Sequence, residues 1–145
     1  MTERQENTAR VVRIWGTPVR RQPAVAVDTS RAVADLGLDG DAHAKAGSDR
    51  QVLLMDQETL DALGLAPGDL KENLTTAGLC LYDQPTGALL RVGDALLRLT
   101  GPCTLCGKTE AIRPGLRQDL AGRRGMLARV VEGGKIRVGD RVEPI

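Results

Sequence analysis

Residues 89–100 read LLRVGDALLRLT, with two short apolar runs on either side of the pair Gly93-Asp94. Runs of this length, rich in Leu and Val and joined by a Gly-Asp pair, predict a β-hairpin with a tight turn. Residues 136–142, IRVGDRV, repeat the same phrase near the end of the chain. Two copies are too few for a repeat protein, so we interpret them as two similar turns in one β-rich fold.

Further short strands are expected on both sides of this hairpin. They cover residues 11–15, 24–28, 51–55, 74–76 and 126–131, and the last is expected to form a hairpin with residues 135–138. Strands at both ends of the chain with short helices between them predict a mainly β fold, closed into a barrel with a few short peripheral helices.

Helix signals are short. Asp56 is an N-cap for a helix over residues 57–63, which Gly64 would end. Residues 37–47 and 67–73 are expected to be loops, and two more short helices are expected over residues 106–113 and 116–120. We expect residues 1–10 to be a flexible lead-in and residues 11–145 to be a single domain.

Charge and length exclude several classes of protein. The 145 residues include 20 Lys+Arg and 19 Asp+Glu, for a net charge of +1. This balance argues against a dedicated nucleic-acid-binding protein, which needs a surplus of cations to neutralise phosphates. No apolar run reaches the length of a membrane-spanning helix. Three cysteines without a leader of secretory type predict free thiols in the cytoplasm.

Aromatic residues are nearly absent, with one Trp, one Tyr and no Phe. Modules that stack bases or hold methylated lysines need aromatic faces. We therefore expect any ligand to be held by hydrogen bonds, by charge or by a covalent bond.

A Cys-x-x-Cys segment is the first candidate for chemistry. Cys106 is expected at the start of a short helix with Lys108 close by, a setting that favours the reactive thiolate. One alternative is that Cys103 and Cys106 are simply small buried apolar residues. A zinc site is a further alternative, but it needs four ligands, and the chain adds only Cys80 and one histidine.

Polar residues in two loops are further candidates. His43 is the only histidine, and Asp41 two positions before it could orient the imidazole for acid–base work. Residues 72–76, ENLTT, could hold a polar ligand. Loops use the same residue types for their own turns, so a structural role remains open for both.

Five arginines occur within seventeen residues: Arg113, Arg117, Arg123, Arg124 and Arg129. Guanidinium groups bind phosphates and other oxyanions through paired hydrogen bonds, so this run could form an anion site. A solvated basic face is the alternative.

Several segments in order resemble one known family, the MOSC domain, named for the C-terminal part of molybdenum-cofactor sulfurases. They are residues 37–43 (GLDGDAH), 50–52 (RQV), 72–75 (ENLT), 91–94 (RVGD), 102–106 (PCTLC) and 138–140 (VGD). The resemblance runs from about residue 11 to residue 145 and implies a β-rich barrel with one key cysteine. Pro102 and Lys108 match the family pattern around that cysteine, which makes Cys106 its counterpart.

The chain departs from the family pattern at three positions. Cys103 stands where a basic residue is common, and Leu105 replaces a second proline. Lys71 stands where glycine usually precedes Glu-Asn. Because Cys103 is a neighbouring thiol, it could act as a resolving cysteine toward a persulfide on Cys106.

The resemblance implies a function. In the sulfurases this cysteine is thought to carry sulfur released by a pyridoxal-phosphate-dependent cysteine desulfurase, and in reductases of N-hydroxylated compounds it binds the molybdenum of the pterin cofactor. The expectation is therefore a protein that binds the molybdenum–pterin cofactor, carries sulfur on Cys106, or both. The alternatives are a molybdenum-dependent reductase of N-hydroxylated bases and amidoximes, and a non-catalytic module that delivers sulfur or cofactor.

The same resemblance, together with the residue types above, gives an expected site. Cys106 and His43 are the expected catalytic residues, and Cys106 is also the expected metal ligand. The expected cofactor-binding residues are Gly40, Asp41, Arg50, Glu72, Asn73, Thr75, Lys108, Arg123 and Arg124. The expected partner is the cysteine desulfurase or a redox partner of a molybdoenzyme, with no nucleic acid and no membrane.

Overall fold

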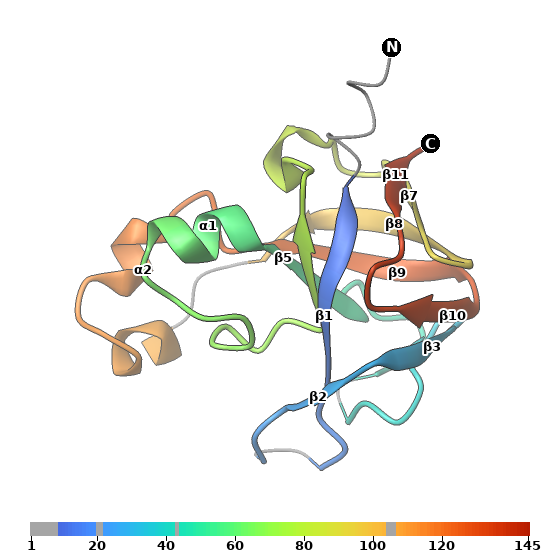
Figure 1. The fold of residues 1–145 in the computed structure, drawn as a ribbon, viewed down its shortest axis with the longest axis horizontal. Helices are drawn as coiled ribbons and strands as arrows, with labels where there is room; N and C mark the ends of the chain where they lie inside the picture. The colour runs from blue at the N-terminus through green and yellow to red at the C-terminus, as the bar shows by residue number, and fades with distance from the viewer. Residues whose placement is uncertain (1–8, 20–21, 43, 104–106) are drawn as a thin grey trace.

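The computed structural model describes residues 9–19, 22–42, 44–103 and 107–145 (Figure 1). Strands dominate it, which confirms the mainly β class. The larger sheet is formed by β1 (Arg10–Gly16), β2 (Val25–Val27), β5 (Val52–Asp56), β6 (Leu74–Ala77), β7 (Leu89–Val92), β8 (Ala95–Pro102), β9 (Met126–Glu132) and β11 (Val142–Pro144). Its eight strands run in the order β11-β7-β8-β9-β5-β6-β1-β2.

The larger sheet is not closed, so the expected barrel describes it only loosely. β2 and β11 are its two edge strands. The segment before β11 nevertheless lies against β1, because the Val11 N–H donates to the Asp140 carbonyl at 2.8 Å and the Gly139 N–H donates to the Val11 carbonyl at 2.8 Å. These contacts bring the β11 end of the sheet against β1 without a strand ladder.

The hairpin of residues 89–100 is confirmed. β7 and β8 pair antiparallel, with Val92 opposite Ala95. Gly93 in the turn has a φ of +56°, and a Cβ there would collide with the carboxylate of Asp140. The turn therefore needs glycine both for its conformation and for its close approach to the second Gly-Asp turn.

The hairpin expected at residues 126–138 is wrong. β9 pairs with β5 and β8, whereas β10 (Gly134–Arg137) pairs with β3 (Thr29–Val33) in a second sheet of order β10-β3-β4. β4 (Gly37–Leu38) lies in the segment expected to be loop. Gly133 lies where the chain leaves β9 for the second sheet. A Cβ at this position would lie 2.7 Å from the Ala32 carbonyl oxygen, so this close approach requires glycine.

The helices are short and largely as expected. In α1 (Gln57–Ala62) the Asp56 carboxylate accepts from the Thr59 N–H at 3.1 Å, and Gly64 follows with a φ of +71°. η2 (Leu81–Asp83), η3 (Gly107–Ala111) and α2 (Leu116–Asp119) complete the set of described helices. No helix in the described part of the chain is long and apolar enough to span a membrane.

Two groups of buried side chains form the core. The larger group lies between and within the sheets and includes Ile14, Leu54, Leu97 and Ile136. The smaller group packs α1 and α2 beside the end of β5: Met55, Leu60, Leu70, Leu116 and Leu120. This second group fixes the helical region against the sheet, and the candidate site lies along that junction.

Candidate functional site

The Cys-x-x-Cys segment begins at Cys103, directly after β8. Cys103 is buried, and its N–H donates to the Gly125 carbonyl at 2.9 Å. A guanidinium nitrogen of Arg50, Nη2, lies 3.9 Å from the Cys103 sulfur. Cys106 and His43 lie outside the described residues, and so does the side chain of Lys108. The Arg50 guanidinium therefore lies beside the sulfur of Cys103, the first cysteine of the Cys-x-x-Cys segment.

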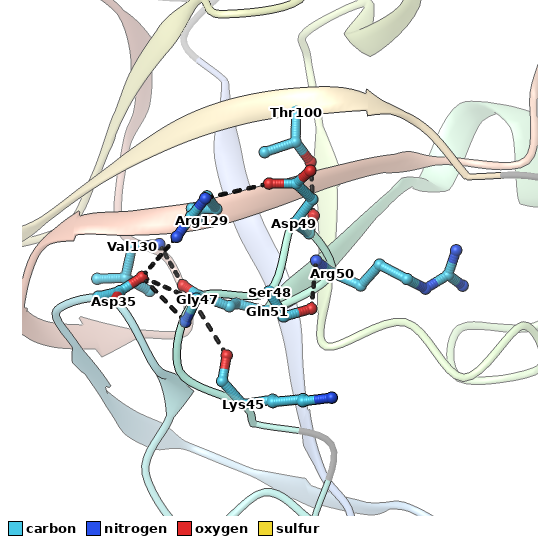
Figure 2. A network of polar contacts seen from close by, with 10 residues as sticks. All are labelled: Asp35, Lys45, Gly47, Ser48, Asp49, Arg50, Gln51, Thr100, Arg129 and Val130. Atoms are coloured by element: carbon cyan, nitrogen blue, oxygen red, sulfur yellow. Dashed lines mark hydrogen bonds and ion pairs between the residues drawn. The ribbon is translucent and has the colours of Figure 1, made fainter.

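A polar network holds the backbone that carries Arg50 (Figure 2). Arg129 bridges two carboxylates, with Nη2 at 2.9 Å from Asp35 Oδ1 and Nη1 at 3.2 Å from Asp49 Oδ1. The Thr100 hydroxyl donates to the Asp49 carbonyl at 2.6 Å. We call Asp35, Asp49, Gln51 and Arg129 the Arg129 clamp. Figure 2 shows the Arg50 side chain extending away from this clamp. The clamp therefore holds the backbone at Arg50 while the Arg50 guanidinium is directed elsewhere.

Gln51 is the buried member of the clamp. Its Nε2 donates to Asp35 Oδ1 at 3.1 Å and to the Lys45 carbonyl at 3.2 Å, and its Oε1 accepts from the Val130 N–H at 3.0 Å. The hydrogen bond from Arg129, and then that from Gln51, hold the pKa of Asp35 below its ordinary value of 3.8. The Asp35 carboxylate in turn raises the pKa of Arg129. Both charges are therefore stabilised by their partners.

Asp41 and Asn73, both expected at the site, contact each other. Asn73 Nδ2 donates to Asp41 Oδ2 at 3.2 Å, and Asn73 Oδ1 accepts from the Leu53 N–H at 2.8 Å. Asp41 Oδ1 also accepts from the Thr17 N–H at 3.2 Å. These bonds tie the 37–42 segment to β5 and to the segments that follow β1 and precede β6. Gly40 beside them is exposed, with a φ of +79°.

Glu72 and Thr75 form a second buried pair. Glu72 is 1% exposed, and its Oε2 accepts from the Thr75 hydroxyl at 2.7 Å and from the Gly68 N–H at 2.8 Å. Trp15 Nε1 donates to the Thr75 hydroxyl oxygen at 3.1 Å. Glu72 Oε1 is buried and has no hydrogen-bond partner in the described structure. It is an acceptor that a ligand or a small shift of the loop could satisfy.

The five arginines do not form one patch. Arg129 belongs to the clamp, Arg113 pairs with Asp119 at 3.0 Å, and Arg123 is exposed and donates to the Asp119 carbonyl at 3.1 Å. Arg124 turns inward, where Nη2 donates to the Leu70 carbonyl at 3.1 Å. Its Nε and Nη1 are buried and have no partner among the described residues.

Two pockets lie on either side of the loop that precedes β6. One, of about 450 Å³, is lined in part by Trp15, Gly68 and Lys71. The other, of about 340 Å³, is lined by Asp69, Leu70, Lys71, Thr109, Ala111, Ile112 and Arg124. Lys71 therefore borders both. No group of three or more potential metal ligands occurs within the described ranges.

Two features of the site escaped the sequence analysis. Asp35 and Asp49 were not among the candidates, and no signal could have found them because Asp35 and Arg129 lie 94 positions apart. Lys71 was noted only as a departure from a family pattern. The structure places it in the left-handed region, at a φ of +60°, which is uncommon for a residue other than glycine.

Comparisons with known proteins agree with this architecture. A family model described as MOSC domain matches residues 41–143. Among solved structures, the YuaD protein of Bacillus subtilis superposes with a TM-score of 0.79 at 21% identity, over 94% of this chain and 95% of that one. YiiM of Escherichia coli gives a TM-score of 0.73 at 24% identity, over 94% of this chain and 69% of that one. These structures support the fold.

A crystal structure described as a hypothetical protein gives a TM-score of 0.77 at 24% identity, over 99% of this chain and 71% of that one. A search of curated proteins gives no match.

Proposed function

The chain belongs to the MOSC domain family, and on that premise we propose that it binds a molybdenum–pterin cofactor with Cys106 as the reactive thiol, which can also carry sulfur. One observation carries this proposal: a cationic side chain, Arg50, lies beside Cys103, the described end of the Cys-x-x-Cys segment. Arg50 lies 3.9 Å from the Cys103 sulfur. Arg124 immediately precedes Gly125, whose carbonyl accepts from the Cys103 N–H at 2.9 Å.

The residues present fit such a cofactor. Arg124 offers two buried donors without partners in the described structure, and Lys71 lies beside it at the same pocket, which suits a phosphate. The buried Glu72 Oε1 offers an acceptor for the N–H groups of a pterin. When bound, the cofactor would supply molybdenum-centred redox and atom-transfer chemistry.

The protein's own contribution is a nucleophile and a charged surround. We assign Cys106 to attack the outer sulfur of a donor persulfide. A sulfur–sulfur bond then forms at Cys106, the bond to the donor cysteine breaks, and the donor leaves as a thiolate. Arg50 and Arg123 are assigned to stabilise negative charge around this step, and His43 is assigned to acid–base work. Asp41 and Asn73 keep the loop in place through their mutual hydrogen bond of 3.2 Å.

The proposed partner follows from this step. A pyridoxal-phosphate-dependent cysteine desulfurase would supply the persulfide, in the cytoplasm where thiols stay reduced. If molybdenum is retained, a redox partner would supply electrons instead, and reduction of N-hydroxylated bases or amidoximes becomes the activity to assay. If neither substrate is turned over, the protein is a delivery module.

The test measures molybdenum content and bound persulfide after expression in a host that makes the pterin cofactor. Wild type, Cys106→Ser and Cys80→Ser are compared, because Cys80 is an exposed free thiol and serves as the matched control. We expect metal or persulfide in wild type and in Cys80→Ser, and neither in Cys106→Ser. Equal loading of all three proteins would contradict the role of Cys106.

A further inference from the structure

Lys71 adopts a backbone conformation that disfavours its own side chain. Its φ is +60°, in the left-handed region where residues with a Cβ are strained. Its side chain is exposed, and its N–H donates to the Gly68 carbonyl at 3.0 Å in the loop before β6. Glycine would satisfy this turn without strain, so the turn itself gives no reason for lysine. Strain of this kind points to a use for the side chain.

Arg124 lines the pocket of about 340 Å³ that Lys71 also borders, and its guanidinium is incompletely bonded. Only Nη2 has a partner in the described structure, the Leu70 carbonyl at 3.1 Å, whereas Nε and Nη1 are buried without one. Buried donors without acceptors are unfavourable, and charged ones more so. An oxyanion would provide acceptors in the fork geometry that a guanidinium prefers.

The pocket between them has the size and lining of a small-molecule site. Its volume is about 340 Å³, within the range of ligand pockets and larger than a bare phosphate needs. Ala111 and Ile112 add apolar surface on the helical side. Among the described residues that line this pocket Asp69 is the one carboxylate, and its Oδ2 already accepts from the Ala66 N–H at 2.8 Å. The two cations outnumber it.

We propose that Lys71 and Arg124 form a binding site for a phosphate monoester, with the phosphate between the two cations and the organic part against Ala111 and Ile112. Arg124 reaches the ligand by turning its guanidinium, which exposes Nε and Nη1 to the pocket. The inference rests on the proposed function only for the natural ligand, which would then be the phosphate end of the cofactor. The site itself needs neither molybdenum nor Cys106.

Inorganic phosphate is the probe, measured by calorimetric titration and by the phosphate-induced rise in the thermal midpoint, with chloride at matched ionic strength as the baseline. The variants are Arg124→Gln, Lys71→Gln and Lys71→Gly. Arg141→Gln is the matched control, since its side chain is 66% exposed and it precedes β11 at the opposite end of the molecule from α2 (Figure 1).

We expect Arg124→Gln to weaken phosphate binding about ten-fold or more, and both Lys71 variants about three- to ten-fold. Lys71→Gly should lose affinity without losing thermal stability, which a merely structural lysine would not do. Arg141→Gln should bind as wild type does. Wild-type affinity in both Arg124→Gln and Lys71→Gly, or no phosphate effect on wild type beyond that of chloride, would overturn the proposal. A wild-type protein that binds phosphate but carries neither molybdenum nor persulfide would count against the proposed function alone.

Discussion

Arg124 and Arg129 lie five positions apart in the sequence, but their guanidinium groups have different partners. Arg129 has a carboxylate for each end of its guanidinium, at 2.9 Å and 3.2 Å, and it joins the 35 and 49 segments to β9. Arg124 has one backbone carbonyl and two buried nitrogens without partners in the described structure. An arginine paired with two carboxylates is explained by the fold, whereas one with two buried nitrogens that have no partner in the described structure calls for a ligand.

The largest effect is expected from Gln51→Leu in the Arg129 clamp. Gln51 is 1% exposed, and its loss leaves the Val130 N–H buried without an acceptor. We expect the free energy of unfolding to fall by about 2–3 kcal/mol, measured by urea denaturation. Gln57→Leu is the control, because the bond of the Gln57 side chain in the described structure stays within α1, to Asp61 at 2.8 Å. Equal stability of the two variants would show that the clamp does not stabilise the fold.

A smaller effect is expected at Tyr82, which supports the backbone next to Arg124. Its hydroxyl lies 2.8 Å from Asp56 Oδ1 and 2.9 Å from the Arg123 carbonyl oxygen. Burial, and then the charge of Asp56, raise the pKa of Tyr82 above its ordinary value of 10.0. Above pH 10 the unfolded chain therefore releases a proton that the folded chain retains, so stability falls as pH rises.

We expect this loss to reach up to about 1 kcal/mol one pH unit above the ordinary value, reduced by the partial exposure of the ring. Urea denaturation at the ordinary value and at one pH unit above it measures this loss of stability in wild type and in Tyr82→Phe. The variant should lack this part of the pH dependence. Parallel pH profiles for the two proteins would refute the assignment.

Lys71→Gly tests whether the backbone is strained at Lys71, which borders the same pocket as Arg124. Removing the Cβ at a φ of +60° relieves the backbone, while glycine makes the unfolded chain more flexible. We expect a net gain of about 0.5 kcal/mol in the free energy of unfolding. Lys45→Gly serves as the control at an exposed lysine without positive φ, and it should destabilise. Destabilisation of both variants alike would mean that Lys71 is not strained.

The smallest effect is expected at Asp35, because its side chain is 60% exposed. Its lowered pKa means that its contribution to stability is complete above pH 3.8 and is lost as the pH falls through the folded-state value. Asp35→Asn should therefore lower the thermal midpoint slightly at pH 7, and the difference from wild type should shrink in acid. The exposed Asp83→Asn is the control. A difference that grows in acid would contradict the pairing with Arg129.

Local signals predicted much of the fold. The 89–100 hairpin, the Asp56 cap and the Gly64 stop each depend on neighbouring residues, and each is confirmed. The pairing of β10 with β3 was missed because the exposed polar residues of β3 carry no strand signal of their own. Contacts between distant segments, not the propensity of either segment, decide such pairings.

Some residues of the expected site are neighbours in the structure, and their assignment to a site stays a prediction. Asp41 with Asn73, and Glu72 with Thr75, are brought together as pairs within the expected site. The run of arginines gave no means of telling Arg124 from Arg129, because the two differ in the partners of their guanidinium groups. Cys106 and His43 remain predictions, since both lie outside the described residues.

The most direct test of the distinction between the two arginines is a crossed measurement. Arg124→Gln and Arg129→Gln are each melted with phosphate and with chloride at matched ionic strength. We predict that Arg129→Gln melts below wild type but keeps the full phosphate-induced rise in midpoint. Arg124→Gln should melt close to wild type in chloride and lose that rise. If Arg124→Gln keeps the rise, or if Arg129→Gln loses it, the assignment of one arginine to the fold and the other to a ligand is wrong.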